Sequence, residues 1–262
     1  MTTGPVHERG GCVSLGLDLP DHLFVAEADG GARETFDLSA MSVADFADRT
    51  AKAVRSVGST FDIHGAPNEL PEAVPFAEDT MERPYNAEAV ERYHGALLRI
   101  VPVFEQFRTA FIGKVSPVHL FRGALDLAVT RFSGRLAPLH PAGIPNLPDD
   151  VAQEAYSREV LSAGFWTGGG GVNEAMFYSY AYPEPDGFVD QPVLPAQARY
   201  DETFGEFLLP YAAVRASDEP AAMLMAFLQS TYDAAAQTGN WVRTALECEP
   251  GRPRVPRHLH RD

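Results

Sequence analysis

The side chains best suited to acid–base chemistry gather in about a quarter of this 262-residue chain, between residues 114 and 182. Four of them can give up or accept a proton in a catalytic step: His119, Asp126, Glu154 and Glu159. A histidine beside an acid acts as a general base near neutral pH, and a carboxyl group does so when burial changes its affinity for protons. These residue types favour proton-transfer chemistry on a small molecule, such as isomerisation, cyclisation or hydrolysis.

Asp126 is the most informative of the four because it interrupts an apolar run, residues 124–129. An unpaired carboxylate buried there would destabilise the fold strongly. Either an arginine pairs with it inside the protein, or it points into a pocket as a catalytic group. Two alternatives also hold for His119, which is either a hydrogen-bonded core residue or a general base.

A second group of side chains in the same region can hold a ligand. Arginine binds carboxylate and phosphate groups, and the rings of tyrosine and tryptophan stack against planar molecules. The tyrosines at 178, 180 and 182 share one face of a predicted strand, which indicates either packing or an aromatic wall. The ligand-binding candidates are Arg122, Arg131, Arg135, Tyr156, Arg158, Trp166, Tyr178 and Tyr180.

The sequence predicts no cofactor. A metal site is the weaker alternative: His119, His140 and one of Glu154 or Glu159 would supply two imidazoles and a carboxylate, but without the short spacing typical of such sites. The glycine run at residues 168–171 lacks the Lys-Ser/Thr pair of a phosphate-binding loop and lies between two predicted strands. We therefore interpret it as a hairpin loop and assign no residue to a metal.

Charge and composition exclude several classes of function. The chain has 36 acidic residues against 21 lysines and arginines, and its net charge of -15 repels nucleic-acid phosphates and anionic lipids. No apolar run reaches the ~20 residues of a membrane helix. The two cysteines, Cys12 and Cys248, form no closely spaced pair, which is typical of reduced thiols. We expect a cytoplasmic protein that binds a small molecule and neither nucleic acid nor membrane.

Short strands occur as hairpin-like neighbours between a few helices, which predicts an α+β fold with mainly antiparallel sheets, helices packed on one side and a single core. Residues 1–64 are expected to form a β-meander and a helix, and residues 65–85 a proline-rich linker. Residues 86–247 are expected to form the main α+β region with the candidate pocket, and residues 248–262 a flexible tail. The whole chain is expected to form one compact domain.

Several ungapped runs carry a family resemblance that extends over nearly the whole chain. The longest are FIGKVSPVH at 111–119 and LDLAVTRFSGR at 125–135; shorter ones are EAYS at 154–157, SAGFW at 162–166, YAYPEP at 180–185 and EFLLPY at 206–211. In these runs the chain resembles the family catalogued as domain of unknown function 5996, and the resemblance implies no reaction. Relatives usually carry a tryptophan at the position of Arg122 and a histidine at the position of Arg158.

The relatives also begin some tens of residues earlier, in a segment expected to form strands. The N-terminal part of this chain is therefore expected to lack part of its sheet. A free sheet edge pairs readily with another strand. We expect a homodimer or a partner chain to cover this edge.

Two functions from different classes remain open. The first is a small-molecule enzyme that uses acid–base chemistry in a pocket of the central strands. The second is a binding protein without chemistry, whose arginines anchor an anionic group. A deep pocket that joins His119 to Asp126 or Glu154 would favour the enzyme, and an arginine-lined groove would favour the binding protein. Polar side chains on opposite faces of the sheet would argue against one shared pocket.

Overall fold

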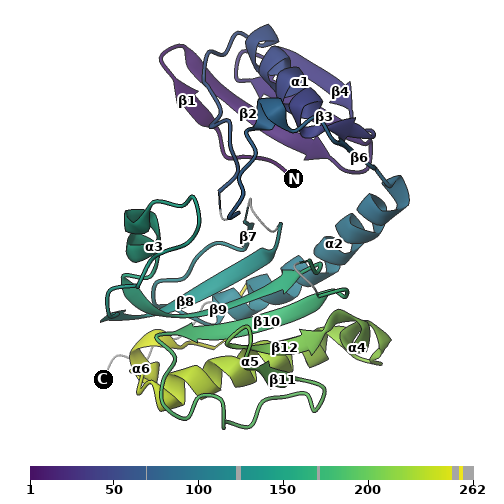
Figure 1. Ribbon diagram of the computed structural model, residues 1–262. Coiled ribbons are helices and arrows are strands. Elements are labelled where there is room, and N and C mark those ends of the chain that lie inside the picture. Colours follow the sequence, from purple (N-terminus) through teal and green to yellow (C-terminus); the bar gives the residue numbers. More distant parts are fainter. Residues whose placement is uncertain (69, 122–124, 170–171, 250–253, 256–262) are drawn as a thin grey trace. The chain divides into compact units, whose positions relative to one another are not determined.

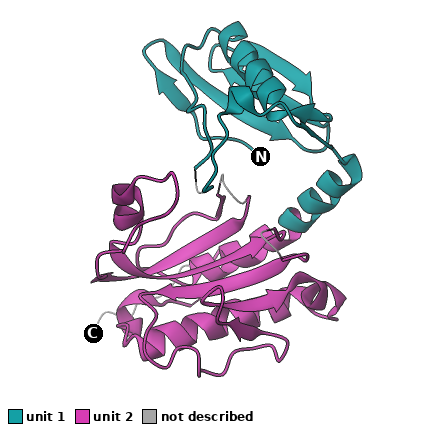
Figure 2. Ribbon diagram, viewed as in Figure 1, with its two compact units in different colours: residues 1–97 teal, residues 98–262 magenta. Residues whose placement is uncertain are grey.

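The computed structural model describes residues 1–262 except 69, 122–124, 170–171, 250–253 and 256–262. The chain forms two compact units, Met1–Leu97 and Leu98–Asp262 (Figure 2). Six helices and antiparallel sheets confirm the α+β prediction. The prediction of a single core differs from the structure, because the N-terminal sheet closes over an apolar cluster of its own.

The first unit is a four-stranded antiparallel meander with one helix packed on it (Figure 1). Its strands, in order across the sheet, are β1 (Val6–Glu8), β2 (Gly11–Asp18), β3 (Leu23–Ala28) and β4 (Arg33–Asp37). Alternate residues of the strands face helix α1 (Val43–Ser56), so that Val13 and Phe24 pack against Ala53 and Val57. The predicted β-meander and helix therefore form.

Residues 65–85, expected to form a linker, contribute to the first unit. The short 3-10 helix η1 (Phe76–Glu78) contacts α1, and strand β6 (Glu82–Arg83) pairs with β5 (Met41–Ser42). The prolines of this segment keep both elements short. Ser42 also begins α1, because its hydroxyl accepts a hydrogen bond of 3.0 Å from the backbone N–H of Asp45.

Helix α2 (Ala87–Thr109) runs across the boundary between the units. Asn86 begins it, since its side-chain oxygen accepts a hydrogen bond of 3.0 Å from the backbone N–H of Ala89. The helix continues through Pro102, which lacks a backbone donor. Its C-terminal half buries Phe107 almost completely in the core of the second unit.

The second unit is built on a six-stranded antiparallel sheet with the strand order β11-β12-β10-β9-β8-β7 (Figure 1). The strands are β7 (His119–Leu120), β8 (Leu127–Leu136), β9 (Arg158–Trp166), β10 (Met176–Tyr182), β11 (Arg199–Asp201) and β12 (Glu206–Pro210). The further helices are α3 (Asp149–Ala155), α4 (Tyr211–Ala216), α5 (Pro220–Thr238) and α6 (Arg243–Leu246). Helix α5 contacts the two central strands β9 and β10.

The two faces of this sheet differ because alternate residues of a strand point to opposite sides. Arg131 of β8 contacts Phe107 of α2 and Tyr232 of α5, so both helices lie on one face, which we call the helix-covered face. The preceding residue, Thr130, stands opposite Ser162 of β9 and points to the other side, which we call the open face.

The described part of the chain contains no helix with the length and apolar character that a membrane crossing demands. Most of the predicted tail, residues 248–262, lies outside the described residues.

Candidate functional site

Asp126 directly precedes β8, and its side chain meets that of Tyr178 from β10. The phenol of Tyr178 donates a hydrogen bond to Oδ2 of Asp126. The tyrosine ring crosses Gly164 of β9, where an added side-chain carbon would overlap with it. Within the described residues, Oδ1 of Asp126 accepts no hydrogen bond and the carboxylate forms no ion pair. The predicted arginine partner is therefore replaced by a phenol.

Four hydroxyl groups form a second hydrogen-bonded array on the open face, which we call the hydroxyl chain: Thr130, Ser162, Tyr180 and Tyr156. The hydroxyls of Thr130 and Ser162 lie 2.9 Å apart across β8 and β9. Ser162 also bonds to Tyr180, and the phenol oxygens of Tyr180 and Tyr156 lie 2.8 Å apart. The rings of Tyr180 and Tyr178 stack with their centroids 6.2 Å apart, which joins the chain to Asp126.

The phenols of Tyr178 and Tyr180 remain neutral. Burial raises the pKa of Tyr178 far above its ordinary value, and the negative charge of Asp126 raises it further. Burial is also the main cause of the raised pKa of Tyr180, with the hydrogen-bonded Tyr156 adding to it. Neutral phenols donate hydrogen bonds without releasing their protons, so they can stabilise negative charge on a bound molecule.

Glu206, the first residue of β12, is a titratable group that sequence reasoning missed. Its neighbour Phe207 stands opposite Ser179 on the helix-covered face, so alternation places Glu206 on the open face. Burial, followed by the negative charges of Asp201 and Asp126, raises the pKa of Glu206 to about 7. A carboxyl group with this pKa can give or take a proton near neutral pH. The only signal in the sequence was an acid at the start of an apolar strand.

Aromatic rings continue the open face beyond the hydroxyl chain. The ring of Tyr156 stacks on that of His140, with the centroids 4.7 Å apart, and meets that of Tyr182 edge-on at 5.0 Å. At the other end of β9, Trp166 meets Phe204 edge-on at 6.5 Å. These rings extend the tyrosine stripe of 178, 180 and 182 to Tyr156, with Trp166 at the opposite end of β9.

His119 belongs to the edge strand β7 and pairs with Ala128, which places its side chain on the open face. Its Nδ1 atom lies 2.9 Å from the carbonyl oxygen of Pro117, and its ring meets that of Phe121 at 4.6 Å. Within the described residues, no hydrogen bond or ion pair joins His119 to Asp126 or Glu154. The predicted histidine–acid pair is therefore not formed there.

Arg131 lies on the helix-covered face, away from the open-face residues. Only 1% of it is exposed, and its guanidinium carbon lies 3.4 Å from the ring centroid of Phe107 and 4.3 Å from that of Tyr232. One nitrogen donates to the backbone oxygen of Phe107. Burial lowers the pKa of Arg131 to about 10, so the side chain stays charged at neutral pH. Arg131 is thus a cation held by aromatic rings in the core.

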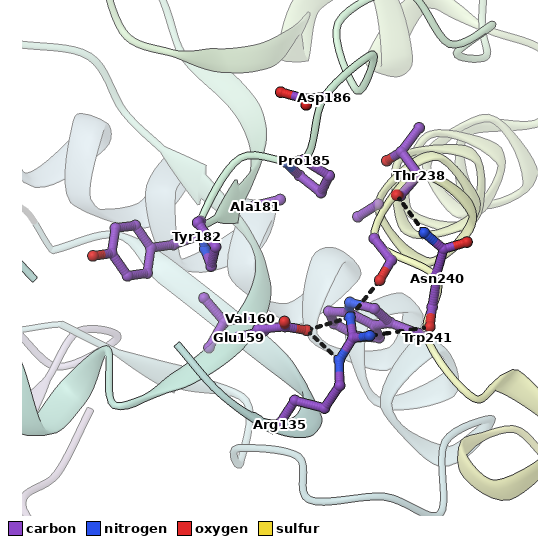
Figure 3. Close-up of a pocket in the computed structure, with 13 residues that line it drawn as sticks. Arg135, Glu159, Val160, Ala181, Tyr182, Pro185, Asp186, Thr238, Asn240 and Trp241 are labelled. Atoms are coloured by element: carbon purple, nitrogen blue, oxygen red, sulfur yellow. Dashed lines mark hydrogen bonds and ion pairs between the residues drawn. The ribbon is translucent and has the colours of Figure 1, made fainter. Parts of the chain in front are cut away.

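Arg135 and Glu159 face the helix-covered side and bind each other. Nε and Nη2 of the arginine lie 2.9 and 2.6 Å from Oε2 of Glu159, which also accepts a bond from Ser133 at 2.8 Å. Arg135 further donates to the backbone oxygens of Gly239 and Asn240, directly after α5. The pair forms part of the wall of a cavity of about 390 Å³ (Figure 3).

Glu154 and Arg158 form no hydrogen bond with either group within the described residues. Glu154 is exposed on α3. Arg158 donates to the backbone oxygen of its own neighbour, Ser157, at 3.0 Å. Arg122 lies outside the described residues. The sequence-predicted residues are therefore divided between the two faces of the sheet, and the shared pocket expected for all of them is not found.

No three histidine, cysteine or acidic side chains in the described part of the chain come together in a way that could hold a metal ion. Nδ1 of His140 accepts a hydrogen bond of 3.0 Å from the backbone N–H of Ala142. With His119 beside Pro117 and Glu159 bound to Arg135, the residues of the weaker metal alternative keep separate partners.

Comparison with known proteins places the chain in a family. The profile described as "Family of unknown function (DUF5996)" matches residues 1–248. Both compact units contribute to this match, and all residues of the open face and of the cavity lie within it. The match confirms the resemblance in the sequence runs. No curated protein and no solved structure matches the chain.

Proposed function

We propose that this chain, which belongs to the DUF5996 family, is an enzyme that transfers protons in a small molecule at the open face of its six-stranded sheet. The observation that carries the proposal is the gathering of Asp126, Glu206 and the hydroxyl chain on one face. Two carboxyl groups in different environments are suited to opposite roles in acid–base catalysis. Asp126, whose Oδ1 accepts no hydrogen bond within the described residues, would accept the proton, and Glu206 would donate it.

The hydroxyl chain supports the same chemistry. Each hydroxyl both donates and accepts a hydrogen bond, so all bonds from Thr130 to Tyr156 can reverse direction together. Tyr156 would then offer a bound molecule either its O–H group or a lone pair. This behaviour fits a reaction in which a substrate oxygen gains and loses negative charge, as in the enolisation of a carbonyl compound.

The alternative, a binding protein with an arginine anchor, has less support. Arg131 is enclosed by rings, and Arg135 is bound to Glu159. Arg158 lies on the same side as the hydroxyl chain but bonds to its own backbone neighbour. The arginines within the described ranges therefore do not converge on one anion. We also propose a cytoplasmic location, since Cys12 and Cys248 form no disulfide.

The proposal is tested by proton exchange at carbon. The full chain is incubated in D₂O with acetone, pyruvate and a panel of other small ketones and 2-oxo acids, and loss of the C–H signal next to the carbonyl group is followed by proton NMR. We expect the protein to accelerate exchange for at least one compound. The variants Asp126→Asn and Glu206→Gln should each lower the rate by about 10²–10⁴-fold, the usual contribution of a general acid or base.

Asp218→Asn is the matched control, because Asp218 is exposed just before α5. It should keep the rate of the unaltered protein. If both carboxyl variants exchange deuterium as fast as the Asp218 variant, the open face is not the catalytic site. Absence of exchange for every compound in the panel would count against carbonyl enolisation as the reaction.

A further inference from the structure

A second candidate site lies at the C-terminal end of α5 and uses none of the hydroxyl chain. Its cavity of about 390 Å³ is at the small end of the range of roughly 300–1,000 Å³ found for ligand pockets. Two carboxylates and one guanidinium line it, from Glu159, Asp186 and Arg135 (Figure 3). The size and these side chains limit what it can hold to a small polar compound.

Arg135 is poorly available for an anionic ligand because its donors are already used. Its guanidinium makes two hydrogen bonds to Glu159 and one each to the backbone oxygens of Gly239 and Asn240. An incoming carboxylate or phosphate would have to displace these bonds. Arg135 therefore fastens the end of α5 to the sheet.

The cavity instead offers several unused acceptors. All three hydrogen bonds received by Glu159 end on Oε2, which leaves Oε1 open. The carboxylate of Asp186 has no hydrogen bond or ion pair within the described residues, and Figure 3 shows it on a different wall from Glu159. Asn240 donates through Nδ2 to the backbone oxygen of Thr238 at 3.3 Å, so its Oδ1 is also available.

The electrostatic field of the cavity favours a positive charge. Its two carboxylates and single guanidinium leave one net negative charge. The C-terminal end of a helix carries a partial negative charge, and the last turn of α5 contains no basic residue to offset it. The rest of the lining combines polar side chains, such as Thr238 and Asn240, with apolar ones, including Val160, Pro183 and Trp241.

We propose that this cavity binds a small primary amine. The ammonium group would donate a hydrogen bond to Oε1 of Glu159, and the carboxylate of Asp186, on a different wall, would add negative charge to the cavity without contacting the same nitrogen. The hydrocarbon part of the ligand would lie against the prolines and the indole of Trp241. The site is separate from the proposed proton-transfer site, so either can fail without the other.

Three probes of the same shape test the proposal: cyclohexylamine, cyclohexanecarboxylate and cyclohexanol. The chain has two tryptophans, so the variant Trp166→Phe leaves Trp241 as the only indole fluorophore, inside the cavity wall. We expect the amine to change this emission saturably, with a Kd of about 1 mM for a compound of this size. The carboxylate and the alcohol should bind at least about tenfold more weakly.

Two acid variants identify the site of binding. Glu159→Gln should weaken amine binding by about fivefold, the size of one partly exposed ion pair, and Asp186→Asn, which removes negative charge from a different wall, should weaken it less. Asp218→Asn, at the other end of α5, should bind like the parent protein. If the tryptophan variant does not fold, the indole N–H signals of the unaltered protein report the titration by NMR, with Trp241→Phe identifying the signal.

Three results would overturn the proposal. They are no saturable change up to about 20 mM amine, equal or tighter binding of the carboxylate, and unchanged amine binding in both acid variants. Selective amine binding that either acid variant weakens would support it.

Discussion

Polar groups on the two faces of the six-stranded sheet differ in their burial and in their hydrogen bonding. On the helix-covered face, Arg131 and Ser179 are almost completely buried, and Nε of the arginine and the serine hydroxyl lack hydrogen-bond partners in the described residues. On the open face, Tyr178 bonds to Asp126 and the members of the hydroxyl chain bond to one another, and all of these residues except Ser162 keep part of their surface exposed. A polar group under the helices therefore contributes to packing, whereas one on the open face remains available to a ligand.

The comparison predicts the largest loss of stability for Arg131→Ala. Removing the side chain leaves a cavity between Phe107 and Tyr232, and the free energy of unfolding should fall by about 3–5 kcal/mol. Arg131→Met keeps most of the volume and removes a buried charge, so it should cost less than about 1.5 kcal/mol. Urea unfolding followed by tryptophan fluorescence measures both, because both tryptophans belong to the second unit.

A comparison of the alanine and methionine variants separates the effect of side-chain volume on stability from the effect of the positive charge. If the methionine variant is as unstable as the alanine variant, the contacts of the guanidinium with the rings stabilise the helix-covered face by themselves. The proposed difference between the faces would then need revision, because charge as well as shape would be required under the helices.

A smaller effect is expected for Tyr178→Phe on the open face. The change removes the hydrogen bond to Asp126 and leaves a partly exposed carboxylate without its donor, which should cost about 2 kcal/mol. Tyr182→Phe is the matched control, since the phenol of Tyr182 makes only a long bond of 3.4 Å to the backbone oxygen of Pro138. It should stay within about 0.5 kcal/mol of the parent. Equal costs in the same unfolding assay would mean that the Asp126–Tyr178 bond adds no stability.

The smallest effect is a pH dependence from Glu206. Its pKa is about 7 in the folded chain against an ordinary value of 4.5, so the folded chain holds this proton more tightly. Its contribution to stability is therefore fully present below about pH 4.5 and is lost as the pH rises towards 7. Glu206→Gln should match the parent near pH 4.5 and exceed it by about 1 kcal/mol at pH 8, a value reduced for partial exposure. Parallel stability curves for the two proteins across this range would contradict the raised pKa.

Much of the fold follows from local signals in the sequence. Apolar residues alternate along β2, and Asp29-Gly30-Gly31 supplies the glycines of the turn between β3 and β4. Asn86 and Ser42 begin two helices through their capping oxygens. These signals act over a few residues, so a single sequence can reveal them. The division into two units depends on contacts far apart in the chain and was not predicted.

The candidate site was predicted less completely, for a physical reason that Arg131 and Glu206 illustrate. Arg131 lies an even number of residues after Leu127 and Val129 in β8, so its side chain points to the same face as theirs. Alternation alone therefore already indicated that Arg131 is buried. Glu206 gains its raised pKa from burial and from Asp201 and Asp126, and Asp126 is distant in the sequence. A pattern of residues shows which groups can titrate, but which of these groups come into contact depends on the folded structure.

The strand order of the second unit has a consequence for association between molecules. Both outermost strands are very short: β11 has three residues and β7 has two. A foreign strand would find few free backbone groups with which to align, and at β11 it would also meet Asp201 facing Glu206. Short edge strands with charged side chains hinder edge-to-edge pairing of sheets from different molecules, and therefore aggregation. The longer strands β8, β9 and β10, whose side chains carry the proposed chemistry, lie between these short outer strands.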